Sequence, residues 1–186
     1  MSDIKKIKTL TIAAMVTALG IVVGFFKIPI TNLLEIRFNT IPLALAGKIF
    51  GPYTAGIVGI LIDIGSYIIR PTGPYFPGFT LSNALSGVIF GFLLRPKKGT
   101  HSPIYRITIA VILNTVFINM ILNSVWLMVL YGKESVIAVL SVRLLKEIVL
   151  IPVNIIIIAA LTKPVEMLLR INEGKNNAGN DIQTGN

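Results

Sequence analysis

The chain has 186 residues, of which 54% are hydrophobic and 13% are charged, and its mean hydropathy is +0.81. This composition excludes an ordinary soluble domain and indicates a polytopic membrane protein, because each span needs about 20 mostly apolar residues. The formal charge of +9 would suggest nucleic acid as the partner of a soluble protein. Here the basic residues lie at the ends of apolar segments, where they set orientation in a membrane, so we expect no nucleic-acid partner. The chain has no cysteine for a disulfide, a thiolate metal site or a nucleophile.

Six apolar segments predict six membrane-spanning helices in a single domain, residues 1–170. Their expected ranges are 8–26, 39–50, 52–70, 80–94, 104–130 and 135–161, with a loop or re-entrant hairpin at 27–38. Lys163 and Pro164 are expected to end the last span, and the polar, Gly- and Asn-rich residues 171–186 predict a disordered tail. The fold class is therefore an all-α integral membrane protein, a six-transmembrane-helix bundle with both termini cytoplasmic.

The distribution of basic residues is the basis for this orientation. Eleven of the 17 lysines and arginines fall on the side of the two termini: Lys5, Lys6, Lys8, Lys48, Arg95, Lys97, Lys98, Arg106, Lys163, Arg170 and Lys175. Four fall on the opposite side, at Lys27, Arg37, Arg70 and Lys133. Cytoplasmic loops carry the excess of Lys and Arg, so we expect a multi-pass protein of the cell membrane with its termini inside. Lys48 should extend its long side chain to the lipid headgroups.

The stretch 60–87 joins the ends of two apolar helices through a turn rich in Gly, Pro and aromatic residues. Before the turn, Asp63, Tyr67 and Arg70 follow one another at spacings of four and three, and they therefore share one helix face. Ionisable residues within spans are functional-site candidates. The prolines of the turn remove backbone freedom, which favours a pocket wall or lid. The alternative is a tight turn between membrane helices, with Asp63 paired to another helix.

The outer half of the predicted bundle gathers charges and aromatic rings. The bases there are Lys27, Arg37, Arg70, Arg143 and Lys146, and they stand against the acids Glu35, Asp63, Glu134 and Glu147. Arginine recognises carboxylates with two parallel hydrogen bonds, so a basic cavity of this kind suits a small organic anion. The rings of Tyr67, Tyr75, Phe76, Phe79 and Trp126 offer flat surfaces to a ring system. The sequence therefore predicts a pocket for an aromatic acid.

Each part of this site has a structural alternative. Arg143, Lys146 and Glu147 could form a closed salt bridge within their helix, although two bases against one acid leave one charge over. Trp126 could be an interfacial belt residue, and the asparagines could join helices by hydrogen bonds. The candidate binding residues are Asp63, Tyr67, Arg70, Pro74, Tyr75, Phe76, Asn83, Asn123, Trp126, Arg143, Lys146 and Glu147.

Small residues form two ridges on the first helix. Ala14 and Ala18 form one, and the neighbouring face carries Ala13, Thr17, Gly20 and Gly24. Either ridge can admit another helix closely, within the bundle or from a partner. Catalytic motifs are lacking: His101 stands alone, and we find no paired metal ligands, nucleophile elbow or phosphate-binding glycine loop. We therefore expect no metal, no cofactor and no enzyme activity, and any pumping must use energy from another subunit.

Several motifs resemble those of a known family. The Ala14-xxx-Ala18 pair, the sequence FKIPI after the first helix, and above all RPTGPYFPGFTLSNALSG are similar to the substrate-binding S components of energy-coupling factor (ECF) vitamin transporters, in particular the folate-specific ones. The resemblance covers nearly the whole chain except the polar tail.

The resemblance implies a folate-binding membrane subunit that joins a transmembrane coupling subunit and two cytoplasmic ATPases, which use the ATP. It also implies that Ala14 and Ala18 dock on the coupling subunit and that residues 71–78 gate the pocket. Folate would offer its glutamate carboxylates to Arg70, Arg143 or Lys146 and its pterin edge to Asp63 or an asparagine. The alternatives are an S component for riboflavin, thiamine or a pyrimidine precursor, a lipid-modifying membrane enzyme using Asp63 and Glu147, and a structural subunit.

Overall fold

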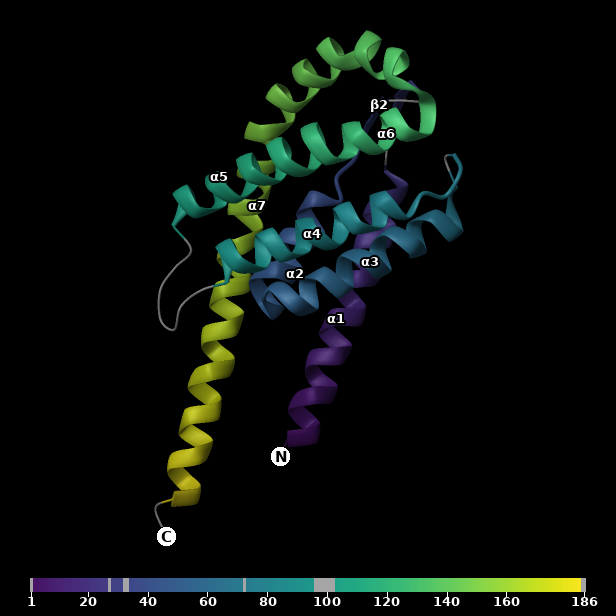
Figure 1. Cartoon of the computed structure of the whole chain (residues 1–186). Coiled ribbons are helices and arrows are strands. Elements are labelled where there is room, and N and C mark those ends of the chain that lie inside the picture. The colour runs from purple at the N-terminus through teal and green to yellow at the C-terminus, as the bar shows by residue number, and fades with distance from the viewer. Residues whose placement is uncertain (1, 27, 32–33, 72, 96–102, 185–186) are drawn as a thin grey trace.

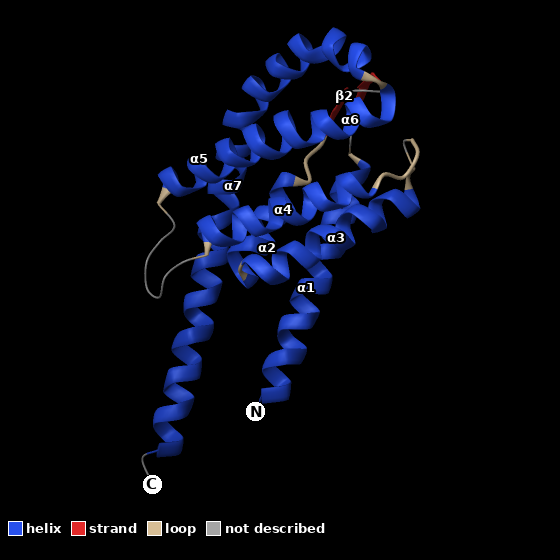
Figure 2. Cartoon of the chain, in the orientation of Figure 1, coloured by secondary structure: helices blue, strands red, loops and turns tan. Residues whose placement is uncertain are grey.

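The computed structural model is a bundle of helices with one small β-hairpin, and it describes residues 2–26, 28–31, 34–71, 73–95 and 103–184 (Figures 1 and 2). The elements are α1 (Ser2–Phe25), β1 (Ile28–Thr31), β2 (Leu34–Ile36), α2 (Thr40–Phe50), α3 (Pro52–Ile69), α4 (Pro77–Leu94), α5 (Ile104–Leu113), the π-helix η1 (Asn114–Leu122), α6 (Asn123–Tyr131) and α7 (Lys133–Thr184). The basic segment 96–102, which includes His101, lies outside the described residues.

Within the described residues, five helical segments are long and apolar enough to cross a membrane: Lys6–Phe25, Pro52–Ile69, Pro77–Leu94, Ile104–Tyr131 and Leu140–Val165. The last of these extends through Lys163 and Pro164, which the sequence predicts to end the span, to Val165. The remaining expected span is α2, which has 11 residues and therefore a length of about 17 Å, short of the roughly 30 Å of the hydrocarbon core. The described ends of α1 and α7 lie at the same end of the molecule (Figure 1).

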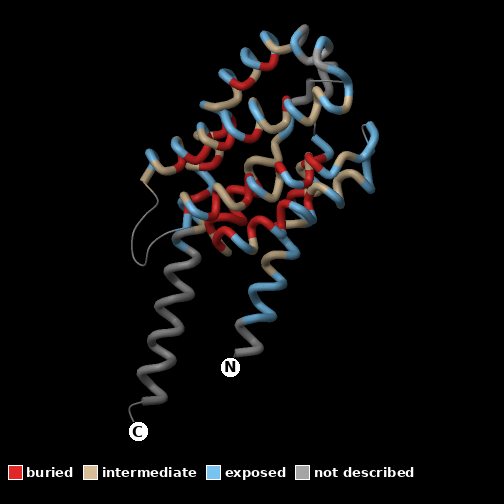
Figure 3. Tube along the Cα trace, viewed as in Figure 1, coloured by how far each residue is buried: buried red, intermediate tan, exposed pale blue. Residues whose placement is uncertain are grey.

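The core lies where α2, α3 and α4 meet, and buried positions concentrate there (Figure 3). The most extensive helix contact is between α3 and α4. It depends on small residues, because a Cβ atom placed on Gly87 would meet the backbone of Ala55. Close approach of backbones through small residues is the usual way in which helices associate in membranes. This packing fixes α3 and α4 against each other.

α2 differs from the sequence-based expectation at Lys48. The side chain was expected to reach the headgroups, but Lys48 is only 1% exposed, so this expectation is wrong. The reason is that α2 is enclosed by its neighbours, with Gly47 packed directly against the backbone of Gly91. α2 ends at Gly51, whose φ of 82° falls in the left-handed region that suits glycine, and Pro52 begins α3 as the sequence predicts.

Three other differences concern helix boundaries and the first outer loop. α4 begins at Pro77 rather than residue 80, since proline is well suited to the first helical position. Residues expected as a loop or re-entrant hairpin form an antiparallel β-hairpin that pairs Ile28 with Ile36. α7 continues as a helix through the segment predicted to be a disordered tail. Extending an existing helix costs less than nucleating one, and in Figure 1 this part of α7 extends away from the bundle.

Candidate functional site

A cavity of about 200 Å³ opens among the helix ends that lie away from both termini. Its wall takes residues from α1, α2, α3, the turn at 73–76, α4, η1, α6 and α7. Eleven of the twelve candidate binding residues line it: Asp63, Tyr67, Arg70, Pro74, Tyr75, Phe76, Asn83, Asn123, Arg143, Lys146 and Glu147. The structure thus brings these eleven candidates together around one cavity, and their role in binding stays a prediction.

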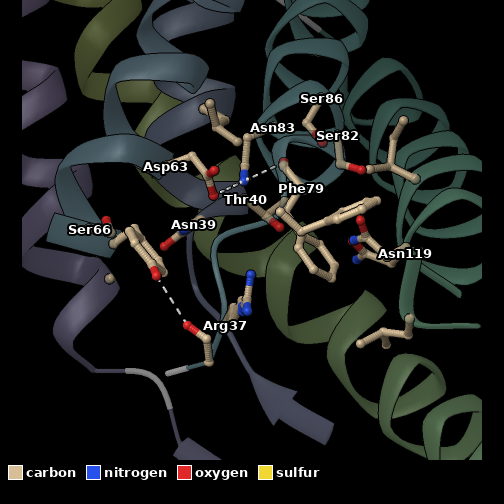
Figure 4. A pocket seen from close by; sticks show the side chains of 18 of the residues that line it. Arg37, Asn39, Thr40, Asp63, Ser66, Phe79, Ser82, Asn83, Ser86 and Asn119 are labelled. Atoms are coloured by element: carbon tan, nitrogen blue, oxygen red, sulfur yellow. Dashed lines mark hydrogen bonds between the residues drawn. The ribbon is translucent and has the colours of Figure 1, made fainter. Parts of the chain in front are cut away.

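One wall is a hydrogen-bond network that joins α3 to the start of α4. Thr80 Oγ1 donates to Asp63 Oδ2 at 2.7 Å, and Asn83 Nδ2 donates to Asp63 Oδ1 at 2.8 Å. Because the single Thr80 hydroxyl proton is committed to Asp63, the Tyr75 hydroxyl is the donor in its 2.9 Å contact with Thr80 Oγ1. Figure 4 shows Asp63 and Asn83 side by side. Asp63 thus pairs with α4, as one reading of the sequence allowed, and it also faces the cavity.

The turn after α3 is held over this wall by aromatic and polar contacts. The rings of Tyr67 and Tyr75 lie 5.1 Å apart between centroids, and the Tyr67 hydroxyl donates to the main-chain oxygen of Gly73 at 3.2 Å. Arg70 Nη1 donates to the main-chain oxygen of Phe25 at 2.8 Å, which ties the end of α3 to the end of α1. The described part of the turn is therefore anchored at both of its ends.

Trp126 differs from the other candidates because it does not line the cavity. Its indole Nε1 donates to Ser82 Oγ at 3.1 Å, and its ring packs against Phe76 with the centroids 5.6 Å apart. Phe76 in turn meets Phe79 edge-on at 6.0 Å. Trp126 thus supports the aromatic wall from behind.

The opposite wall carries the charges of α7. Lys146 Nζ lies 3.0 Å from Glu147 Oε1, so these two residues form the ion pair that the sequence allowed. Arg143 is the cation left over: it is only 7% exposed, and its Nη2 donates to the main-chain oxygen of Asn119 at 3.1 Å. The Asn119 side chain contacts Glu147 Oε2 at 3.4 Å. The π-helical geometry of η1 places Asn119 where it contacts both residues.

Buried polar atoms without partners gather around the cavity. Among the described residues, seven buried side-chain polar atoms accept or donate no hydrogen bond. Six of the seven belong to residues that line the cavity: Asn39, Ser66, Asn114, Asn123, Arg143 and Asn154. Such atoms are rare in folded proteins, because a buried polar atom without a hydrogen bond costs free energy of folding. Their concentration here indicates a site built to bind a polar ligand.

Sequence reasoning missed part of this lining. Asn39, Ser66, Asn114, Asn119 and Asn154 were not among the candidate binding residues, yet all contribute to the wall. The available signal was a polar side chain inside an apolar helix, which marks functional positions in membrane proteins. The charged residues of the lining gave a stronger signal in the sequence than the amides did. Four bases line the cavity, Arg37, Arg70, Arg143 and Lys146. With the two acids, Asp63 and Glu147, they give the lining a formal charge of +2.

Comparison with known proteins supplies a family match. The model of the family described as "ECF transporter, substrate-specific component" matches residues 8–162. The chain is 37% identical over 169 residues to the folate transporter FolT of Clostridium novyi, covering 91% of this chain and 96% of the relative. It is 32% identical over 161 residues to the riboflavin transporter RibU of Staphylococcus aureus, covering 80% and 82%.

A solved structure agrees with these relatives. The crystal structure of FolT bound with folic acid superposes with a TM-score of 0.76 at 34% sequence identity, covering 85% of this chain and 96% of that chain.

Proposed function

Because the chain belongs to the family of ECF transporter substrate-specific components, we propose that it is the folate-binding subunit of a vitamin importer in the cell membrane. The observation that carries this proposal is the cavity, whose lining combines a formal charge of +2 with buried polar atoms that lack partners. Folate has two glutamate carboxylates, an aminobenzoyl ring and a pterin with donors and acceptors on its edge. The likeness to FolT, including the form bound with folic acid, supports folate among the vitamins.

The two walls suit different parts of such a ligand. Arg143 has one buried nitrogen, Nη1, without a hydrogen-bond partner among the described residues, so it can donate to a carboxylate. Arg70 at the rim and Lys146 are the other candidates. The aminobenzoyl ring would lie against Phe79 and its neighbours. The pterin edge would meet Asp63 or an asparagine. In this arrangement the protein binds its ligand without chemical change, which agrees with relatives that are transporters rather than enzymes.

We further propose that the subunit works with a transmembrane coupling subunit and two cytoplasmic ATPases, which hydrolyse the ATP. Six membrane crossings with both termini inside would suit this assembly. The ends of α1 and α7 lie on one side of the molecule, and the cavity lies at the opposite end. An external pocket would then capture the vitamin, and the turn at 71–78 would close over it.

The test is calorimetric titration of the purified, detergent-solubilised chain with folate, riboflavin and thiamine. We expect tight binding of one folate per chain and no heat from the other two vitamins. Riboflavin is the informative control because the chain also resembles RibU. Binding of riboflavin or thiamine in place of folate would agree with the family assignment but contradict folate as the substrate. The absence of binding to all three would contradict a vitamin-capture role for this cavity.

A further inference from the structure

A second groove lies apart from the ligand cavity, between α1 and the start of α3. It has a volume of about 380 Å³ and is lined by Lys6, Thr9, Leu10 and Ala13 of α1 and by Thr54 of α3. None of these five residues lines the cavity described above. The groove is therefore separate from the proposed vitamin site.

The groove forms because α1 extends past the start of α3. The two helices run in the same direction, and a Cβ atom placed on Gly24 would meet the side chain of Ser66. In this register Pro52, the first residue of α3, is level with Leu10 of α1. Residues 2–9 therefore continue about 12 Å beyond α3, and Figure 1 shows this part of α1 leaving the bundle.

The groove lies on a different face of α1 from the ridge of Ala14 and Ala18. Each residue of a helix turns by about 100°, which places Lys6 and Ala13 on one face and the two alanines of the ridge about 110° round the helix. A partner helix that docks on the ridge therefore lies to one side of the groove. The groove instead continues the face on which Gly24 packs against α3.

The lining changes from polar to apolar along the axis of α1. The segment of α1 that is long and apolar enough to cross a membrane begins at Lys6, so this residue lies at the membrane boundary. Thr9 follows nearly one turn further along, and then come Leu10, which is 72% exposed, and Ala13. A phospholipid has the same order of groups, namely a charged headgroup, polar ester groups and an acyl chain.

The charge at this end of the molecule decides which lipid suits the groove. Lipid tails are as apolar as leucine, so the apolar walls alone do not select one lipid over another. By sequence position, the end with the two termini carries eleven bases and four acids. Bases at a membrane surface attract anionic headgroups. A lysine ammonium has three donors, so Lys6 can contact a phosphate in addition to its contact within the protein.

We propose that this groove binds an anionic phospholipid, with the headgroup beside Lys6 and one acyl chain between α1 and α3 over Ala13. The site goes beyond the proposed function, because it involves neither the vitamin nor its cavity. The bound lipid fills the step that α1 leaves beyond the start of α3, and it thereby supports the part of α1 that lacks a neighbouring helix there.

The test adds lipid to the purified, detergent-solubilised chain and counts the bound molecules by native mass spectrometry. Dioleoylphosphatidylglycerol is the anionic probe, and dioleoylphosphatidylcholine, which has the same tails, is the zwitterionic one. We expect one phosphatidylglycerol per chain, bound about fivefold more tightly than phosphatidylcholine. Lys6→Gln should remove this preference, because one base at the membrane surface contributes about 1 kcal/mol, the equivalent of that fivefold difference.

Two matched controls separate the groove from the rest of α1. Lys8→Gln removes the same charge two residues away, at a position outside the lining, and should keep the preference. Ala13→Phe places a ring in the groove and should weaken phosphatidylglycerol binding at least tenfold, whereas Ala14→Phe, outside the lining, should not. The Lys6→Gln comparison does not depend on packing at Ala13, so it decides the question even if Ala13→Phe is unstable.

Several results would overturn the lipid site. Equal binding of the two lipids by the unmodified protein would contradict recognition of the headgroup. Equal losses in Lys6→Gln and Lys8→Gln would indicate general attraction to the charge of α1, and undiminished binding by a folded Ala13→Phe would place the lipid elsewhere.

A photo-crosslinking experiment distinguishes a lipid from a protein in the groove. Leu10 is replaced by p-benzoylphenylalanine in the complete transporter, in vesicles that contain phosphatidylglycerol. We expect a crosslink to lipid. A crosslink to another subunit instead would show that the groove is a protein docking site and would overturn the proposal.

Discussion

Arg143 Nη2 on α7 donates a hydrogen bond to the main-chain oxygen of Asn119 in η1 at 3.1 Å. The acceptor lies inside a π-helix, a rare form that is frequent at functional sites. The same residue contacts Glu147 through its side chain. One position in η1 thus orients a base and an acid of α7, while Arg143 Nη1 has no partner among the described residues.

Replacing Arg143 with methionine should weaken folate binding by roughly 10- to 100-fold. The change keeps the length of the side chain but removes a charge-assisted hydrogen bond, which contributes about 1.5–3 kcal/mol. Isothermal titration of the purified variant measures the loss. Arg106→Met is the matched control, because Arg106 lies at the start of α5 and outside the cavity lining. Equal folate affinities in the two variants would contradict the assignment of Arg143 to the anion site.

Tyr75→Phe should speed ligand release. The hydroxyl of Tyr75 donates to Thr80, which donates to Asp63, so the turn is linked to the binding wall. Losing one hydrogen bond of about 1 kcal/mol predicts roughly fivefold faster dissociation, while the ring contact with Tyr67 remains. Stopped-flow displacement of bound folate gives the rate. A dissociation rate equal to that of the parent protein would show that this link does not hold the turn closed.

Gly87→Ala should destabilise the protein by about 1–3 kcal/mol, since the added Cβ meets the backbone of Ala55 and cannot be accommodated by a side-chain rotation. Thermal unfolding in detergent should show a lower melting temperature. Gly56→Ala tests the same helix pair more mildly, because its new Cβ meets the side chain of Val88 at 3.1 Å. If Gly56→Ala lowers the melting temperature as much as Gly87→Ala, backbone approach is not the cause.

Larger side chains should have different effects on the two ridges of α1. Ala14 and Ala18 are exposed, whereas Gly20 is buried and a Cβ there would meet Ile62 of α3. Ala14→Leu combined with Ala18→Leu should therefore preserve folate binding by the isolated subunit but abolish uptake into vesicles that contain the complete transporter. Gly20→Leu, in contrast, should lower the melting temperature of the subunit itself. Loss of binding in the double alanine variant would place that ridge inside the protein's own bundle.

The sequence predicted much of this architecture because long apolar segments and Gly-Pro breaks are local signals. The break at Gly51 and Pro52 is confirmed, and the expected helix at 104–130 is continuous from Ile104 to Tyr131. The π-helical segment could not be foreseen, since it depends on how Asn119 contacts α7. The depth of Lys48 was missed for a similar reason: burial of a short helix depends on its neighbours, and charge alone suggested an exposed position.

The charged candidates lie together at the cavity, whereas several amides of its lining were not among the candidates. Asp63 and Arg143 were singled out because an ionisable group in a span is costly unless it has a use. Asn114 and Asn154 gave a weaker signal, because an asparagine in a span also joins helices by hydrogen bonds. Only the three-dimensional arrangement distinguishes an oxygen paired across helices from one that faces a cavity.

The π-helix η1 also sets the direction in which the helix after it projects. A π-helix places about one more residue in a turn than an α-helix does, and an α-helix turns by about 100° per residue. If residues 114–122 formed an ordinary α-helix without a change in length, everything after them would therefore rotate by about that angle. Asn123 would turn from the cavity, and Trp126 would lose its contact with Phe76. The shape of this wall thus depends on the hydrogen-bonding pattern of η1 as well as on the residues that line the cavity.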